Sequence, residues 1–104
     1  MHVVDLQQAW SDVLARAKLT QHHTITRESL SVRDFMTRII RQLQNKRFVE
    51  FSELFEEAVE SGQGVPVVIV NFIALLELSR ESLVEITQAE PYAPIYVRLS
   101  FSPS

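Results

Sequence analysis

Two helices joined by a short turn are predicted by residues 51–80, FSELFEEAVESGQGVPVVIVNFIALLELSR. Ser52 is placed to cap the first helix, and glutamates crowd its N-terminal half, where negative charge suits the helix dipole. Gly62 and Gly64, the two glycines of the chain, end this helix and form the turn. Pro66 suits the first turn of a second helix over 66–80. The stretch therefore predicts a helix–turn–helix pair.

Hydrophobic periodicity on either side of this pair extends the pattern. Upstream, a helix is predicted over 32–46 and a short strand over 48–51. Downstream, alternating apolar and polar residues predict strands over 83–87 and 95–99, joined by a loop that contains two prolines. A helix–turn–helix followed by a β-hairpin is the winged-helix arrangement, and the strand at 48–51 can complete a three-stranded sheet. The predicted fold class is α+β, mainly α.

An additional helix is predicted before this unit, over 6–19, where apolar residues recur at helical spacing. Asp5 with Gln8, and Ser31 with Asp34, have the spacing of capping boxes at the starts of the helices at 6–19 and 32–46. The predicted organisation is an N-terminal helix with an extended connection, a winged-helix domain and a tail, over 1–30, 31–100 and 101–104.

The composition is typical of one soluble domain: 104 residues, 46% of them hydrophobic and 22% charged. The chain has no cysteine, which excludes disulfides, thiolate zinc sites and cysteine catalysis. No apolar run approaches the ~18 residues of a membrane span, and no secretory signal pattern is present at the N-terminus. We therefore expect a cytoplasmic protein without a membrane partner.

Charge is distributed unevenly along the chain. Residues 1–47 carry eight Lys or Arg against four acidic residues, whereas residues 48–104 carry two against nine. The two halves can neutralise each other by packing together, or one of them can dock a charged partner. The main basic set is either a solvated helix surface or a weak, non-specific phosphate contact; it comprises Arg33, Arg38, Arg41, Lys46 and Arg47.

Sequence-specific DNA readout through the helix at 66–80 is disfavoured. The second helix of a helix–turn–helix reads base edges with Arg, Lys, Asn or Gln. This helix offers Asn71, and Arg80 at its far end, and it lies in the acidic half of the chain. Negative charge there would repel DNA phosphates.

The same helix is apolar around its whole circumference. At 100° per residue, one sector of about 100° holds Ile69, Phe72, Ile73 and Leu76. The opposite sector holds Val67, Val70, Ala74 and Leu78. A helix with two apolar sides needs cover on both. A partner protein can supply the second cover, as can the helix at 6–19 or a second copy of the domain.

Catalytic, cofactor and metal sites are not predicted. His22 and His23 are adjacent, so on a strand they point to opposite faces and cannot bind one metal together. The helix-spaced glutamates from Glu53 to Glu60 are typical of solvated charge, and no glycine-rich phosphate loop is present. We therefore expect no enzymatic activity.

Four segments resemble the C-terminal region of bacterial segregation and condensation protein A (ScpA), the kleisin subunit of the SMC complex. They are Ser31–Met36 (SVRDFM), Phe51–Phe55 (FSELF), Val68–Leu78 (VIVNFIALLEL), and Gln88 with Tyr92, Ile95 and Tyr96. The pairing of FSELF with FIALLEL is far more specific than a generic helix pattern. The resemblance covers about residues 5–99.

This resemblance implies a protein-binding role in chromosome segregation and condensation, at the nucleoid. Kleisin C-terminal winged helices bind the ATPase head of an SMC protein, with apolar contacts from the second helix of the motif. The matching positions of that helix are Phe72 and Leu76, with Ile69 and Ile73 beside them, and the wing positions are Tyr92, Ile95 and Tyr96. ATP chemistry would belong to the SMC head.

The chain departs from the family in length. Family members are more than twice as long and also carry an N-terminal domain for a second SMC molecule and a segment for the partner ScpB, both of which are absent from this sequence. We therefore expect a fragment, or a truncated member that does not bridge two heads. The alternatives are a winged-helix DNA-binding transcriptional regulator and a self-associating domain.

Overall fold

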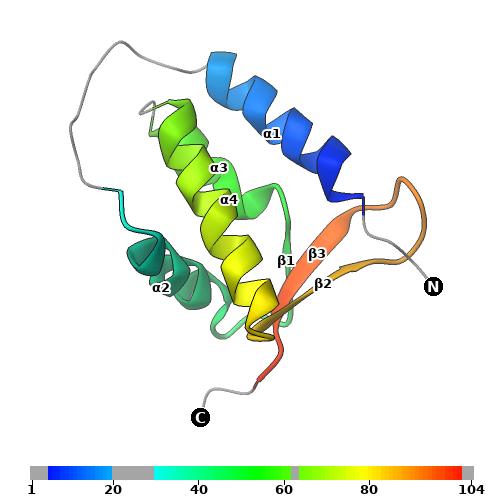
Figure 1. Cartoon of the computed structure of the whole chain (residues 1–104). Helices are drawn as coiled ribbons and strands as arrows, with labels where there is room; N and C mark the ends of the chain where they lie inside the picture. Colours follow the sequence, from blue (N-terminus) through cyan, green and yellow to red (C-terminus); the bar gives the residue numbers. More distant parts are fainter. Residues whose placement is uncertain (1–4, 20–29, 62–63, 102–104) are drawn as a thin grey trace.

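The computed structural model describes residues 5–19, 30–61 and 64–101 (Figure 1). It contains four helices and three strands in these ranges: α1 Leu6–Leu19, α2 Val32–Leu43, β1 Val49–Glu50, α3 Glu53–Glu60, α4 Val65–Arg80, β2 Val84–Gln88 and β3 Ile95–Leu99. The predicted α+β, mainly helical class is confirmed, and the elements follow in the predicted order. The predicted extended connection, most of the tail and Gly62 lie outside the described residues.

The helices begin where local chemistry satisfies their free N–H groups. The Asp5 carboxylate accepts a hydrogen bond from the Gln8 N–H at 3.3 Å, and the Ser31 hydroxyl accepts one from the Asp34 N–H, also at 3.3 Å. Both predicted caps are therefore present. Ser52 precedes α3 but makes no side-chain capping bond, so that prediction was wrong. Gly64 begins α4 at a φ of 90°, a left-handed value that favours glycine.

Left-handed residues account for two of the element ends that differ from the sequence-based bounds. The predicted helix over 32–46 ends at Leu43, since Asn45 takes a φ of 66° and the Lys46 N–H bonds to the Leu43 carbonyl. At the end of α4, Ser82 takes a φ of 61° and the Leu83 N–H bonds to the Leu78 carbonyl. This is the geometry of a Schellman motif, so β2 begins one residue later than predicted.

The three strands form one antiparallel sheet in the order β1-β3-β2. Val97 lies opposite Val49 on one side and Ile86 on the other, while Tyr96 lies opposite Glu50 and Thr87. Ile95 and Val97 point inward and are buried, whereas Arg98 is exposed on the outer face, where it pairs with Glu85. The sheet therefore has one face on the core and one in solvent.

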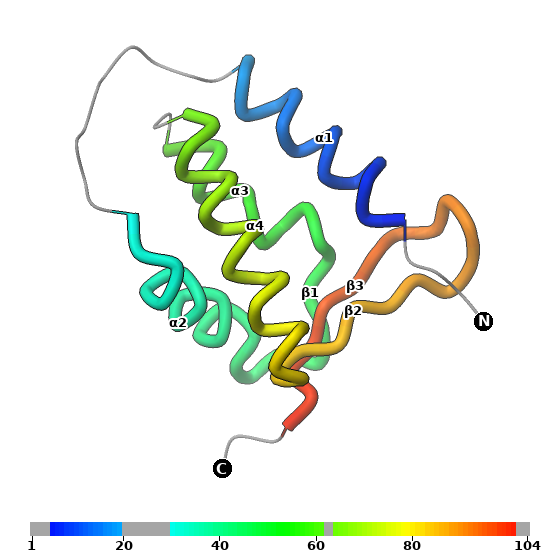
Figure 2. The backbone as a smooth tube through the Cα atoms, in the orientation of Figure 1, coloured from blue at the N-terminus to red at the C-terminus, as the bar shows by residue number. Residues whose placement is uncertain are grey.

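The core lies between α2, α3, α4 and the inner face of the sheet, and α1 covers the side of α3 and α4 that lies away from α2 (Figure 2). An aromatic cluster joins α1 to this core. The Trp10 ring stacks on Phe72 with centroids 4.1 Å apart, and its centroid lies 5.9 Å from that of Phe55. The additional N-terminal helix is thus packed onto the helix–turn–helix pair.

Asn71 is the buried polar residue of α4, with 4% of its surface exposed. Its amide nitrogen donates a hydrogen bond to the Leu54 carbonyl of α3 at 3.0 Å, which ties the two helices together. Because its side chain is inside the protein, Asn71 is not placed to read a DNA base.

Replacing Asn71 with alanine is expected to lower the free energy of unfolding by about 1–3 kcal/mol, since a buried hydrogen bond and its packing are lost. Urea unfolding followed by circular dichroism measures this change. Gln42→Ala on α2, which lacks a described hydrogen bond to another helix, is the control. Equal stability of the two variants would contradict a structural role for the Asn71–Leu54 bond.

Candidate protein-interaction surface

Helix α4 buries one side and exposes the other. The buried arc consists of Val67, Val68, Asn71, Ala74, Leu75 and Leu78. On the opposite side, Ile69, Ile73 and Leu76 are 39%, 45% and 41% exposed. These three residues follow the i, i+4, i+7 spacing of a single helix face, and we call them the α4 stripe. Of the sector predicted as Val67, Val70, Ala74 and Leu78, Val70 is half-buried and the other three are buried, so this sector is the core side of the helix.

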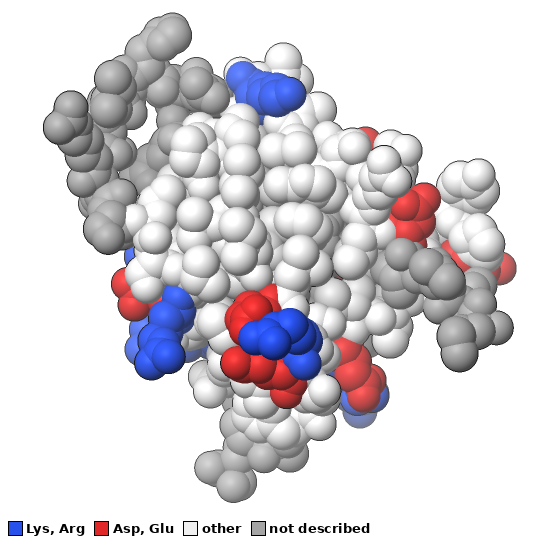
Figure 3. Space-filling model, viewed as in Figure 1, with Lys and Arg blue, Asp and Glu red and all other residues white. Residues whose placement is uncertain are grey.

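The surroundings of the α4 stripe carry little charge. In the space-filling view, the face over α4 and α1 is largely uncharged, with Lys, Arg, Asp and Glu mainly around its margins and near the C-terminal end of α4 (Figure 3). At that end, Arg80 forms an ion pair with Glu77, and the Arg80 Nε donates to Glu77 Oε2 at 3.1 Å. The hydrogen bond from Arg80 lowers the pKa of the Glu77 carboxyl below its usual value. The apolar surface thus ends at a neutralised charge pair.

Phe72 lies beside the α4 stripe but is largely covered within the chain. Trp10 of α1 stacks on its ring at an interplanar angle of 11°, and the rings of Phe51 and Phe55 lie 6.2 and 6.3 Å away. Helix α1 therefore covers the part of the apolar sector that Phe72 occupies and leaves Ile69, Ile73 and Leu76 accessible.

The three wing residues implied by the resemblance lie in different environments. Tyr92, in the β2–β3 loop, is 97% exposed and has a left-handed φ of 69°. Ile95 is buried on the inner face of the sheet. Tyr96 is on the outer face, half-buried, with its ring edge-to-face against Phe48 at 4.8 Å. The structure therefore does not gather these residues into one patch with the α4 stripe.

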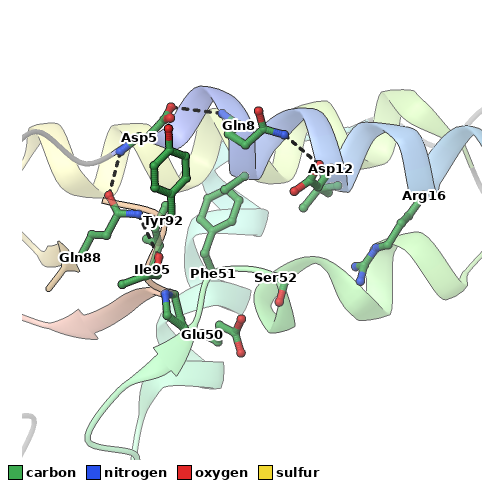
Figure 4. Close-up of a pocket in the computed structure, with 14 residues that line it drawn as sticks. Asp5, Gln8, Asp12, Arg16, Glu50, Phe51, Ser52, Gln88, Tyr92 and Ile95 are labelled. Carbon is green, nitrogen blue, oxygen red and sulfur yellow. Dashed lines mark hydrogen bonds between the residues drawn. The ribbon is translucent and has the colours of Figure 1, made fainter. Parts of the chain in front are cut away.

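A hollow of about 350 Å³ runs along one side of α1 and is closed on the other side by residues 50–52 and the wing (Figure 4). Tyr92 and Asp5 lie at one end of it, and Arg16 lies at the other. The Asp5 N–H donates to the Gln88 side-chain oxygen at 3.2 Å, and the Gln88 amide nitrogen donates to the Ala93 carbonyl at 2.9 Å. Gln88 therefore links the wing to the start of α1. The resemblance named Gln88 but did not imply this role.

The described residues include neither a metal-ligand cluster nor a membrane-spanning helix. Within residues 5–19, 30–61 and 64–101, no group of three or more His, Cys, Asp or Glu side chains is placed to hold a metal ion. In the same ranges, no helix combines the length and apolar character that a membrane span requires. The three histidines lie outside the described residues.

Comparison with known protein families identifies the family of this chain. The family model described as segregation and condensation protein ScpA matches residues 1–100. The chain belongs to the ScpA family. The relatives that this family groups are named segregation and condensation proteins.

Individual ScpA relatives match nearly the whole chain. Segregation and condensation protein A of Coxiella burnetii is 45% identical over 95 residues, which cover 90% of this chain and 34% of the relative. The Xylella fastidiosa strain 9a5c protein of the same name is 41% identical, covering 94% and 31%. The Listeria welshimeri protein is 36% identical, covering 90% and 37%. The chain thus spans about a third of the length of these ScpA relatives.

Proposed function

We propose that this domain is a non-enzymatic protein-interaction module that binds the ATPase head of an SMC protein, at the nucleoid in the cytoplasm. The observation that carries the proposal is the α4 stripe, in which three large aliphatic side chains are 39–45% exposed on one face of a helix in a ScpA-family chain. Apolar side chains that gather on a surface with little charge favour a protein partner.

The alternative, a DNA-binding transcriptional regulator that inserts α4 into the major groove, is poorly supported by the same helix. Its exposed face consists mainly of aliphatic residues, and Asn71 is buried. Arg80 is the basic residue of α4, and its guanidinium is paired with Glu77. A reading helix needs exposed polar or cationic side chains toward the bases.

We assign the wing a secondary role in head binding. Tyr92, at 97% exposure, is available for contact with a partner beyond the α4 stripe. Ile95 and Tyr96 stabilise the sheet that carries this loop. Phe72 packs against Trp10 of α1 next to the α4 stripe and holds α1 in place beside it. The proposed direct contacts are therefore Ile69, Ile73 and Leu76, with Tyr92 at the periphery.

A titration of this chain with the purified SMC head of the same organism, followed by calorimetry, tests the proposal. We expect saturable one-to-one binding that persists at physiological salt. A 30-base-pair duplex in place of the head is the control. Failure to bind the head, together with tight and sequence-dependent DNA binding, would favour the regulator.

Self-association is a separate outcome, measured by sedimentation of the chain alone. A dimer that Leu76→Arg dissociates would assign the α4 stripe to a second copy and would contradict the head-binding proposal.

A further inference from the structure

A cationic surface covers the solvent-facing side of α2 and the turn that follows it. Arg33, Arg38 and Arg41 are exposed on α2, within an arc of about 140° at 100° per residue, and Arg38 borders the buried side at Phe35. Two further exposed cations follow in the turn before β1. We call these five residues the basic surface: Arg33, Arg38, Arg41, Lys46 and Arg47.

Within residues 5–19, 30–61 and 64–101, no ion pair involves the basic surface. Among the residues that the structure describes, Arg80 and Arg98 form ion pairs with Glu77 and Glu85, whereas none of the five basic-surface residues does. Asp34 is the single acidic residue of α2. A local excess of positive charge is therefore exposed on a chain whose formal net charge is −3.

From this surface we infer that the domain binds the sugar–phosphate backbone of duplex DNA, without sequence preference, through α2 rather than through α4. Four of the five cations are arginines, whose planar guanidinium groups bind phosphate oxygens bidentately. Exposed amide side chains of Gln44 and Asn45 lie next to them in the chain, and amides are common phosphate contacts.

The geometry of α2 suits a backbone contact. From Arg33 to Arg41 the helix rises about 12 Å, which is the axial length of about three or four base pairs of duplex DNA. The Arg38 guanidinium lies over the Phe35 ring, 4.7 Å from its centroid, so its position is partly fixed before binding.

The basic surface and the α4 stripe are on separate helices. Helix α2 packs against α4 with its apolar side, so its exposed arc points away from that contact. The two surfaces therefore share no residue. The DNA inference does not depend on the identity of the partner that covers the α4 stripe.

Fluorescence anisotropy of a labelled 40-base-pair duplex, titrated with the full chain at several salt concentrations, tests the inference. If four or five phosphates are contacted, the slope of log K against log salt is expected to lie between about −3.5 and −4.5. Arg38→Gln with Arg41→Gln is expected to reduce the magnitude of this slope by about 1.8 and the affinity at low salt about tenfold or more.

The matched control removes the same charge elsewhere. Arg80→Gln with Arg98→Gln takes away two arginines that are already paired with glutamates, and it is expected to leave both slope and affinity nearly unchanged. Arg38→Lys with Arg41→Lys keeps the charge and is expected to retain most of the slope. Circular dichroism of every variant checks that α2 remains folded.

Equal losses in the two glutamine double variants would mean that net charge alone attracts DNA, and would overturn the inference. Unchanged DNA binding in Arg38→Gln/Arg41→Gln, combined with weaker binding to the SMC head, would assign the basic surface to the protein interface instead. Leu76→Arg separates this inference from the proposed function, because it is expected to disrupt head binding and leave DNA binding intact.

Discussion

Leu76→Arg is expected to lower the affinity of the domain for the SMC head at least 100-fold. Leu76 lies in the α4 stripe and is 41% exposed, so the arginine can be accommodated in the free domain but would be forced into an apolar contact in the complex. Loss of a central apolar contact and desolvation of a charge together cost about 2.8 kcal/mol or more, which corresponds to 100-fold. Calorimetric titration measures the change.

Phe48→Arg is the matched control for this substitution. Phe48 is also a large exposed apolar residue, at 55%, but it packs against Tyr96 on the outer face of the sheet. We expect its affinity for the head to stay within about threefold of the original, an effect under 1 kcal/mol. A larger loss of affinity for Phe48→Arg than for Leu76→Arg would show that the head binds the sheet and not α4. Early thermal unfolding of Leu76→Arg would show instead that Leu76 supports the core.

Phe55→Ala is expected to lower the free energy of unfolding by about 3–5 kcal/mol. The Phe55 ring is buried at the centre of the aromatic cluster, 4.9 Å from the Phe51 ring and 5.9 Å from the Trp10 ring between centroids. Its removal leaves a cavity where α1, α3 and α4 meet. For a domain of this size each kcal/mol shifts the unfolding midpoint by about 4–8 °C, so a fall of roughly 12–40 °C is expected.

Thermal unfolding followed by circular dichroism measures this shift, with Phe48→Ala as the control for the same chemical change at an exposed site. That control is expected to cost about 1 kcal/mol or less, since little apolar area is lost from the core. Similar midpoints for the two variants would contradict the assignment of the aromatic cluster as the junction between α1 and the rest of the domain.

Much of the fold follows from local sequence patterns. The helix at 6–19 and the strand at 95–99 were predicted at their observed bounds, because hydrophobic periodicity of 3.6 or 2 residues runs through each without interruption. The strand predicted over 48–51 is shorter, Val49–Glu50, and the helix predicted over 66–80 begins at Val65. The ends at Asn45 and Ser82 depend on left-handed residues other than glycine. Such conformations are set by the hydrogen bonds of the surrounding turn, and residue type alone does not identify them.

The candidate surface was harder to predict, because α4 is apolar on all sides. Helical spacing separated Ile69, Phe72, Ile73 and Leu76 from the opposite sector but gave no reason to call either one core. In the first sector, Phe72 is covered and the other three residues are exposed. The cover is Trp10, which stacks on Phe72 and lies 62 residues before it in the sequence, so helical spacing alone does not predict the difference. Likewise, alternation along β3 places Ile95 and Tyr96 on opposite faces, whereas the family resemblance named both as interface residues.

Cysteine footprinting tests the central claim, that the α4 stripe is the surface covered by the SMC head. The chain contains no cysteine, so Ile73→Cys and Phe48→Cys each introduce a single reactive thiol. The rate of alkylation of each variant is measured with and without saturating head. We predict that the head slows alkylation at position 73 at least tenfold and leaves position 48 unchanged. Unaltered alkylation at position 73 in a saturated complex would contradict the account.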